Sequence, residues 1–120
     1  RSPEGDKAFA LVQNKEGYFT PSEFDSYLNM SNILHSQRAD ADLVIWLDLP
    51  PEKALERINK RARGCESGIP LNYLIDLDNA YRTVLDDLSK RTQVITIDAT
   101  QNAQQVLSIA GNIIGTMTAA

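Results

Sequence analysis

The chain has 120 residues, of which 42% are hydrophobic, and its formal net charge is −4. This is the length of one domain or of part of one, and the apolar content is enough to bury a core, which argues against a disordered chain. The negative charge argues against a protein that binds nucleic acid along its phosphate backbone, although a local cluster of cations could still bind a small anion.

Cys65 is the only cysteine and His35 is the only histidine. These counts rule out an intramolecular disulfide and the spacings of cysteine–histidine zinc sites, and they leave one base for a Ser-His-Asp triad. We therefore expect no metal ligands in this chain. No apolar run reaches the ~18 residues of a membrane span and no secretory leader is visible, so we expect a cytoplasmic location, with a mitochondrial one as the alternative.

The first 20 residues show no clean helical or strand period. Thr20-Pro21-Ser22-Glu23 is typical of a helix start, with proline at the first helical position and glutamate placed to complete a capping box. Apolar residues then recur at helical spacing and predict a helix to about residue 38.

Leu43 to Leu47 form a continuous apolar run of strand length, which is typical of a strand covered on both faces. Two prolines end this run and begin a helix predicted over 51–62. Pro70 opens a longer helix, whose apolar face extends from Leu71 to Leu88.

A second strand is predicted over 93–98, and the apolar residues of 106–114 predict a closing helix. Strands separated by long helices indicate an α/β fold with a parallel sheet. Because two strands alone make a marginal sheet, we expect further strands from sequence upstream of Arg1 or from a partner chain.

Positive charge is concentrated in the segment RINKRARGCESGIP at 57–70. Like charges at i,i+4 on a helix cost about 0.2–0.5 kcal/mol each, although cations near a helix C-terminus complement its dipole. One interpretation is therefore a solvated, well-capped helix face. The other is that Arg57, Arg61 and Arg63 converge on phosphate oxygens, which guanidinium groups bind bidentately, while Gly64 and Gly68 let the segment open and close.

The segment DLVIWLDLPPEKALERINKRARGCESGIPLNYLIDLDNAY at 42–81 resembles the deoxynucleoside kinase family, which includes the deoxycytidine, deoxyguanosine and insect multisubstrate kinases. The shared pattern is a buried strand, a Pro-Glu helix start, Arg-x-x-x-Arg-x-Arg, an acid, Gly-Ile-Pro-Leu and Tyr-Leu. Arg1-Ser2, with Asp6 after it, resembles the end of the family's Glu-Arg-Ser motif and its substrate helix.

The resemblance implies a P-loop kinase-type parallel sheet flanked by helices, incomplete in this chain. Residues 1–120 would be the C-terminal part of a single domain, with a lid at about 57–70. The implied reaction is the ATP-dependent phosphorylation of a deoxynucleoside 5′-hydroxyl in nucleotide salvage, with ATP and Mg²⁺ as cofactors and the metal held mainly by upstream residues. The implied partner is a second copy of the chain, through the helix at 20–38, and neither nucleic acid nor a membrane.

Several residues match positions of known role in the family. Arg57, Arg61 and Arg63 match the lid arginines, which grip the ATP phosphates during transfer. Glu66 matches the lid acid that hydrogen-bonds the sugar 3′-hydroxyl.

The remaining matches lie nearer the two ends. Arg1 matches the arginine near the attacking 5′-hydroxyl, and Asp6 matches a position that contacts the base. Thr100, Gln101 and Asn102 match the loop that lies against the adenine of ATP. Ala10 departs from the pattern, because the family places a base-stacking aromatic there.

No G-x-x-x-x-G-K-[ST] stretch occurs in the sequence, so the loop that cradles the β-phosphate would lie upstream. We therefore expect these 120 residues to be inactive alone. Two alternatives stay open: a nucleoside monophosphate kinase resembling thymidylate kinase, and a non-catalytic, kinase-derived nucleotide-binding subunit.

Overall fold

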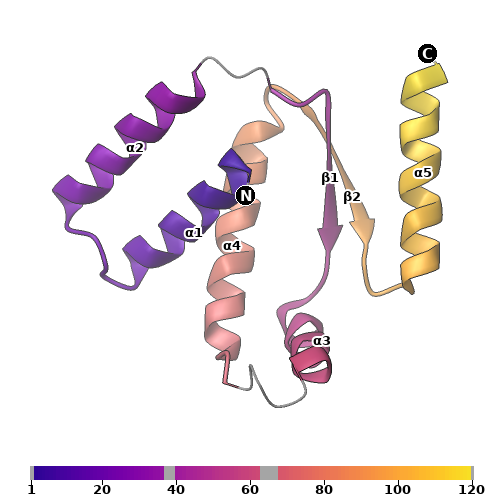
Figure 1. The fold of residues 1–120 in the computed structure, drawn as a ribbon, viewed down its shortest axis with the longest axis horizontal. Helices are drawn as coiled ribbons and strands as arrows, with labels where there is room; N and C mark the ends of the chain where they lie inside the picture. Colours follow the sequence, from indigo (N-terminus) through magenta and orange to yellow (C-terminus); the bar gives the residue numbers. More distant parts are fainter. Residues whose placement is uncertain (1, 37–39, 63–67, 120) are drawn as a thin grey trace.

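The computed structural model of the protein describes residues 2–36, 40–62 and 68–119. Five helices flank a two-stranded sheet in this part of the chain (Figure 1). In chain order the elements are α1 (Pro3–Lys15), α2 (Pro21–His35), β1 (Leu43–Asp48), α3 (Pro51–Ala62), α4 (Leu71–Leu88), β2 (Gln93–Asp98) and α5 (Ala103–Ala119).

The sheet confirms the predicted α/β class. β1 and β2 pair in parallel, in a register that runs from Leu43 opposite Gln93 to Asp48 opposite Asp98. The chain between them passes through α3 and α4, and α4 and α5 lie on either side of the strands in Figure 1. Both strands therefore end at the same edge, where α3 begins and where the segment leading into α5 starts.

The contact between β1 and α4 is aromatic. The rings of Trp46 and Tyr81 lie 5.2 Å apart, and Phe9 of α1 approaches the same tyrosine edge-on at 6.4 Å. The strands are not covered on both faces as the apolar run predicts, since Leu47 is 49% exposed. The reason is that each strand has only one neighbour among the described residues.

α1 was not predicted by periodicity, because its buried face is made of small residues. Gly5, Ala8 and Val12 are buried, and the last two pack against Ala80 and Val84 of α4. The start of the helix did carry a local signal. The Ser2 hydroxyl accepts a hydrogen bond from the Gly5 amide at 3.1 Å, and proline follows the cap.

α2 begins as predicted and ends slightly earlier. The Thr20 hydroxyl accepts from the Glu23 amide at 3.1 Å, and the glutamate accepts from the Thr20 amide at 2.9 Å. The last helical residue is His35, and 37–39 lie outside the described residues. Apolar side chains of α2 remain exposed, namely Met30, Ile33 and Leu34.

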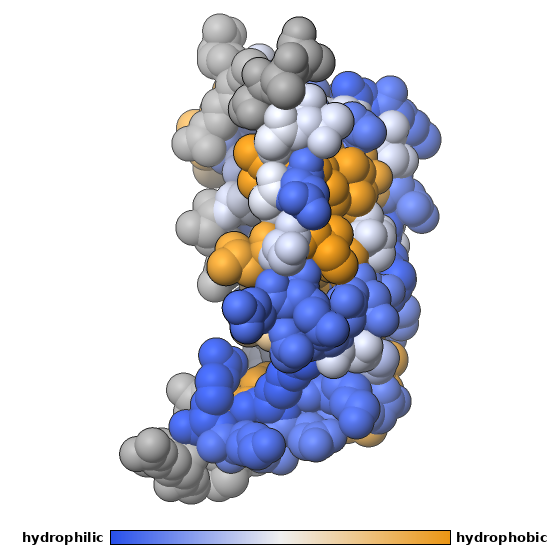
Figure 2. Space-filling model, turned by 90° about the vertical axis from the view of Figure 1, so that its right-hand side faces the viewer, coloured by the Kyte–Doolittle hydropathy of each residue, from blue (hydrophilic) through white to orange (hydrophobic). Residues whose placement is uncertain are grey.

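α5 closes the described chain and packs against β2. Figure 2 shows apolar side chains gathered over the upper part of the face that α5 forms, and hydrophilic side chains below, where α3 lies. Leu107, Ile114 and Met117 are among the exposed apolar residues. None of the helices in the described ranges is both long and apolar enough to cross a membrane.

Candidate functional site

The carboxyl edge of the sheet is the first feature of the site. Asp48 and Asp98 occupy the last paired position of β1 and β2. Ligands of parallel α/β sheets bind outside the carboxyl ends of the strands. The two segments that leave this edge are α3, with its arginines, and residues 99–102, which lead into α5.

Arg57 joins these two segments. Its Nη2 donates a hydrogen bond of 2.8 Å to the backbone oxygen of Ala99. The amide of Ala99 donates in turn to the backbone oxygen of Asp48, also at 2.8 Å. The structure thus brings the first of the predicted lid arginines against the start of the predicted adenine loop.

The loop after β2 is held by hydrogen bonds among its own residues and the end of the strand. The Asp98 carboxylate accepts hydrogen bonds from the Thr100 hydroxyl at 2.7 Å and from the Thr100 amide at 2.9 Å. These bonds, the hydroxyl's first, lower the pKa of Asp98. The Gln101 side chain also donates to the Asp98 backbone oxygen at 2.9 Å. The loop is therefore shaped by its own residues before any ligand binds.

Asn102 caps α5. Its side-chain oxygen accepts from the Gln105 amide at 2.8 Å, and its own amide donates to the Gln105 side chain at 3.1 Å. This reciprocal pair satisfies two backbone donors at the helix start. The Asn102 side chain is thus turned toward the helix. In the predicted adenine loop, Thr100 and Asn102 are exposed and Gln101 is half-buried.

Arg61 lies one turn beyond Arg57 on α3. Within the described ranges it makes no hydrogen bond or ion pair, and it lines a shallow hollow together with Arg57, Lys60 and Leu49. A cationic hollow beside the carboxyl end of β1 suits the binding of an anion. The predicted site residues Arg1, Arg63 and Glu66 lie outside the described residues.

Asp6 lies in the first turn of α1. α1 packs against α4 and α2, whereas α3 packs against α4. At the opposite end of α1, Lys15 forms an ion pair of 2.6 Å with Asp76, near the start of α4. The predicted base-contacting residue and the arginines of α3 are thus held by a common helix.

Sequence reasoning missed Arg82 and Asp48. The Arg82 guanidinium donates to Asp78 at 3.0 Å and to Asp48 at 2.7 Å, and these bonds, that to Asp78 first, raise the pKa of Arg82. Arg82 thereby ties α4 to the end of β1. The available signal was that an aspartate directly follows the first predicted strand and that another ends the second.

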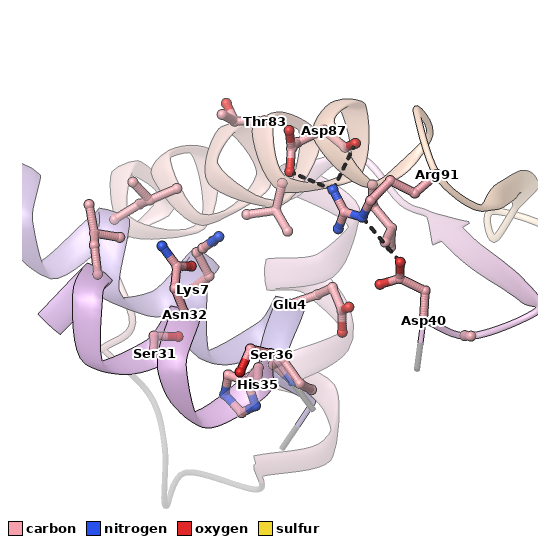
Figure 3. Close-up of a pocket in the computed structure, with 16 residues that line it drawn as sticks. Glu4, Lys7, Ser31, Asn32, His35, Ser36, Asp40, Thr83, Asp87 and Arg91 are labelled. Atoms are coloured by element: carbon pink, nitrogen blue, oxygen red, sulfur yellow. Dashed lines mark hydrogen bonds and ion pairs between the residues drawn. The ribbon is translucent and has the colours of Figure 1, made fainter. Parts of the chain in front are cut away.

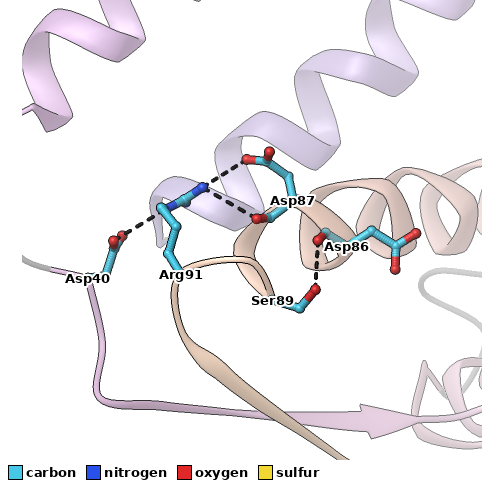
Figure 4. A network of polar contacts seen from close by, with 5 residues as sticks. All are labelled: Asp40, Asp86, Asp87, Ser89 and Arg91. Atoms are coloured by element: carbon cyan, nitrogen blue, oxygen red, sulfur yellow. Dashed lines mark hydrogen bonds and ion pairs between the residues drawn. The ribbon is translucent and has the colours of Figure 1, made fainter.

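A separate cavity of about 590 Å³ lies between α1, α2, α4 and residues 40–41 (Figure 3). One wall carries Arg91, which donates to Asp87 at 3.0 Å and to Asp40 at 3.2 Å (Figure 4). Lys7 and His35 also line the cavity. Its lining contains none of the site residues predicted from the sequence.

Comparison with known proteins decides the family. A family model described as deoxynucleoside kinase matches residues 1–117. The chain belongs to the deoxynucleoside kinase family. This confirms the resemblance that the arginine pattern indicated.

Individual kinases of this family extend the comparison. Deoxyadenosine kinase of Dictyostelium discoideum is 39% identical over 93 residues, which are 78% of this chain and 38% of that protein. Deoxyguanosine kinase of the same organism is 35% identical over 99 residues, or 82% of this chain and 35% of that protein. The chain therefore spans little more than a third of the length of these relatives.

A solved kinase structure has the same fold as this chain. The structure of deoxyadenosine kinase from M. mycoides with bound dCTP superposes with a TM-score of 0.84 at 20% sequence identity. The match covers 97% of this chain and 62% of that one. The predicted kinase-type α/β fold of the chain is confirmed.

Proposed function

We propose that this protein phosphorylates the 5′-hydroxyl of a deoxynucleoside with ATP, in nucleotide salvage. The observation that carries the proposal is the hydrogen bond between Arg57 and Ala99. It joins the cationic helix to the loop after β2 at the carboxyl edge of the sheet, in a chain of the deoxynucleoside kinase family. Residues 1–120 would form the C-terminal part of the kinase domain, with the lid at about 57–70.

The phosphates of ATP would bind at the end of α3. Phosphoryl transfer depends on positioning and on stabilising the charge of the transferred group, and arginines elsewhere accelerate it by about 10³–10⁵. Arg61, which is free of partners in the described part of the chain, and Arg63 would supply this charge. Arg57 would contribute too, since a guanidinium has five N–H donors and the Ala99 oxygen occupies one.

The adenine and the deoxynucleoside would bind on the two sides of these phosphates. Thr100, Gln101 and Asn102 would lie against the adenine. Arg1 would lie near the attacking hydroxyl, Asp6 would contact the base and Glu66 would bind the sugar 3′-hydroxyl.

Mg²⁺ would be held by other residues of the kinase. In the described part of this chain no three His, Cys, Asp or Glu side chains gather so as to hold a metal ion. The nearest candidates, Asp48 and Asp98, are engaged by Arg82 and Thr100. The residues present thus suit the phosphates and base of ATP, and not the metal.

The test is transfer of labelled phosphate from ATP by the full-length protein. Deoxyadenosine, deoxyguanosine, deoxycytidine, thymidine and thymidylate are offered in competition. We expect transfer to a deoxynucleoside. Transfer to thymidylate alone would identify a monophosphate kinase, and nucleotide binding without any transfer would identify a non-catalytic subunit.

A paired substitution tests the arginines. Arg61→Ala is expected to lower turnover at least about tenfold, because it removes charge stabilisation of the transferred group. Lys53→Ala is the control, since it removes a cation from the same helix that pairs only weakly, at 3.7 Å, with Glu56. Equal turnover of the two variants and an unchanged fold would favour a solvated helix face.

A further inference from the structure

Ala99 has both backbone groups engaged by different elements. Its amide donates to the Asp48 oxygen at the end of β1, and its oxygen accepts from Arg57 of α3, each at 2.8 Å. The residue is only 7% exposed. A buried backbone oxygen is nearly always paired, so the Arg57 bond meets a requirement of the fold at this point.

The bond from Arg57 attaches the following loop to α3. The side chains of Thr100 and Gln101 donate hydrogen bonds to Asp98, at the end of β2. The side chain of Asn102 accepts a hydrogen bond from the first turn of α5. Among the hydrogen bonds of the described residues, that of Arg57 is the one that joins this loop to α3. Without it, the loop would be held by β1 and by its own turn.

We propose that Arg57 is a positioning residue that fastens the loop at 99–102 to α3. The helix that carries the phosphate-binding arginines and the loop that lies against the adenine would then keep a fixed separation. Resting on the proposed function, this assigns Arg57 a role in addition to the phosphate contact that it would share with Arg61: Arg57 sets where the base of ATP lies relative to its phosphates.

The pair Arg57 and Arg61 makes the inference testable. Both are arginines on one face of α3, one turn apart, and within the described ranges only Arg57 bonds the loop. Substitution of either removes the same charge from the same helix. A difference between the variants at the loop therefore reports the bond to Ala99, and not the charge.

The first measurement is hydrogen–deuterium exchange of the full-length protein without nucleotide. Arg57→Met, which keeps the aliphatic stem but no donor, is expected to speed exchange in the peptide containing 99–102 at least about fivefold, because the loop opens locally more often. Arg61→Ala is expected to leave that peptide at the wild-type rate. Unchanged exchange in Arg57→Met, or an equal increase in both variants, would overturn the inference.

A second variant guards against misfolding. Arg57→Gln retains a polar side chain that is too short to reach the Ala99 oxygen, and the same increase in exchange is expected. Wild-type exchange in this variant would count against the bond.

Kinetics supply a readout that a general loss of stability would not produce. Arg57→Met should raise the KM for ATP at least about fivefold more than the KM for the deoxynucleoside, because the loop and the phosphate site that this side chain would serve both bind ATP and not the deoxynucleoside. An equal rise in both constants would overturn the positioning role. If the full-length protein transfers no phosphate to any deoxynucleoside, the proposed function fails, whereas the exchange experiment still decides whether Arg57 holds the loop.

Discussion

The carboxylate of Asp98 ends β2 and turns back onto the loop that follows. The hydrogen bonds from Thr100 stabilise its ionised form and lower its pKa. Because the pKa is lowered in the folded chain, this interaction stabilises the fold above the ordinary aspartate pKa of about 3.9. The contribution is lost as the pH falls through the lowered folded value.

Asp98→Asn should therefore destabilise the protein in a pH-dependent way. The melting temperature of the variant is expected to lie below that of the wild type at pH 7, and the gap should narrow on acidification below about pH 4, where the wild-type carboxylate becomes protonated. Thermal unfolding followed by circular dichroism across this range measures it. Asp25→Asn, on an exposed position of α2, is the control, and a gap that stays constant with pH would refute the role of the charge.

The proposed sugar contact of Glu66 gives a second prediction for a single residue. Glu66→Gln should raise the KM of deoxynucleosides that carry a 3′-hydroxyl more than that of their 3′-deoxy analogues, because the amide accepts that hydrogen bond less strongly than a carboxylate. Steady-state kinetics with both substrates make the comparison. Equal losses would leave Glu66 without this role.

The sequence does not predict how the roles of the arginines differ. The spacing of Arg57 and Arg61 and the family resemblance identified both as candidates. Yet the partner of Arg57 is 42 residues away in sequence, and that of Arg82 on β1 is 34 residues away. Such partners are set by the packing of α3 and α4 against the strands, which no local pattern encodes.

At the scale of elements, α1 and α4 meet through small side chains. Ala8 is fully buried against α4. Ala8→Leu is expected to destabilise the protein by about 1–3 kcal/mol, because a close-packed interface has no room for three more carbons. Urea unfolding measures the change, and Gln13→Leu, on the exposed side of α1, is the control. Equal effects of the two variants would contradict a tight interface.

The capping box of α2 yields a milder prediction. Thr20→Ala removes the hydroxyl that accepts from the Glu23 amide and should cost about 1 kcal/mol of stability. Thr20→Ser keeps the hydroxyl and should stay near the wild type in the same urea titration. A serine variant as unstable as the alanine variant would show that the cap is not the cause.

The elements differ in how well the sequence predicted them. β1, β2, α3 and α4 were predicted almost to the residue, because apolar runs and prolines mark their ends. α1 was not predicted from hydrophobic periodicity, because Gly5, Ala8 and Val12 form too weak an apolar stripe to show a helical period. Small residues hide a buried helix face from pattern reasoning even where they allow the closest packing.

At the scale of the whole molecule, α2 presents apolar side chains outward. Ile33 and Leu34 are 72% and 66% exposed, and the family resemblance implies a homodimer through this helix. Ile33→Asp in the full-length protein is therefore expected to shift the sedimentation coefficient from dimer to monomer, because a charge would be buried in the interface. Asn29→Asp, an exposed position of the same helix, is the control. A dimer that survives Ile33→Asp would place the interface elsewhere.

The ring contact between Trp46 and Tyr81 has a practical consequence. Trp46 is the only tryptophan among the 120 residues, and its neighbour lies on α4, the helix that follows the proposed lid. Indole emission depends on the polarity and quenching groups around the ring. The wild-type chain thus carries its own optical reporter, and any rearrangement that slides α4 along β1 should alter its fluorescence without an added dye.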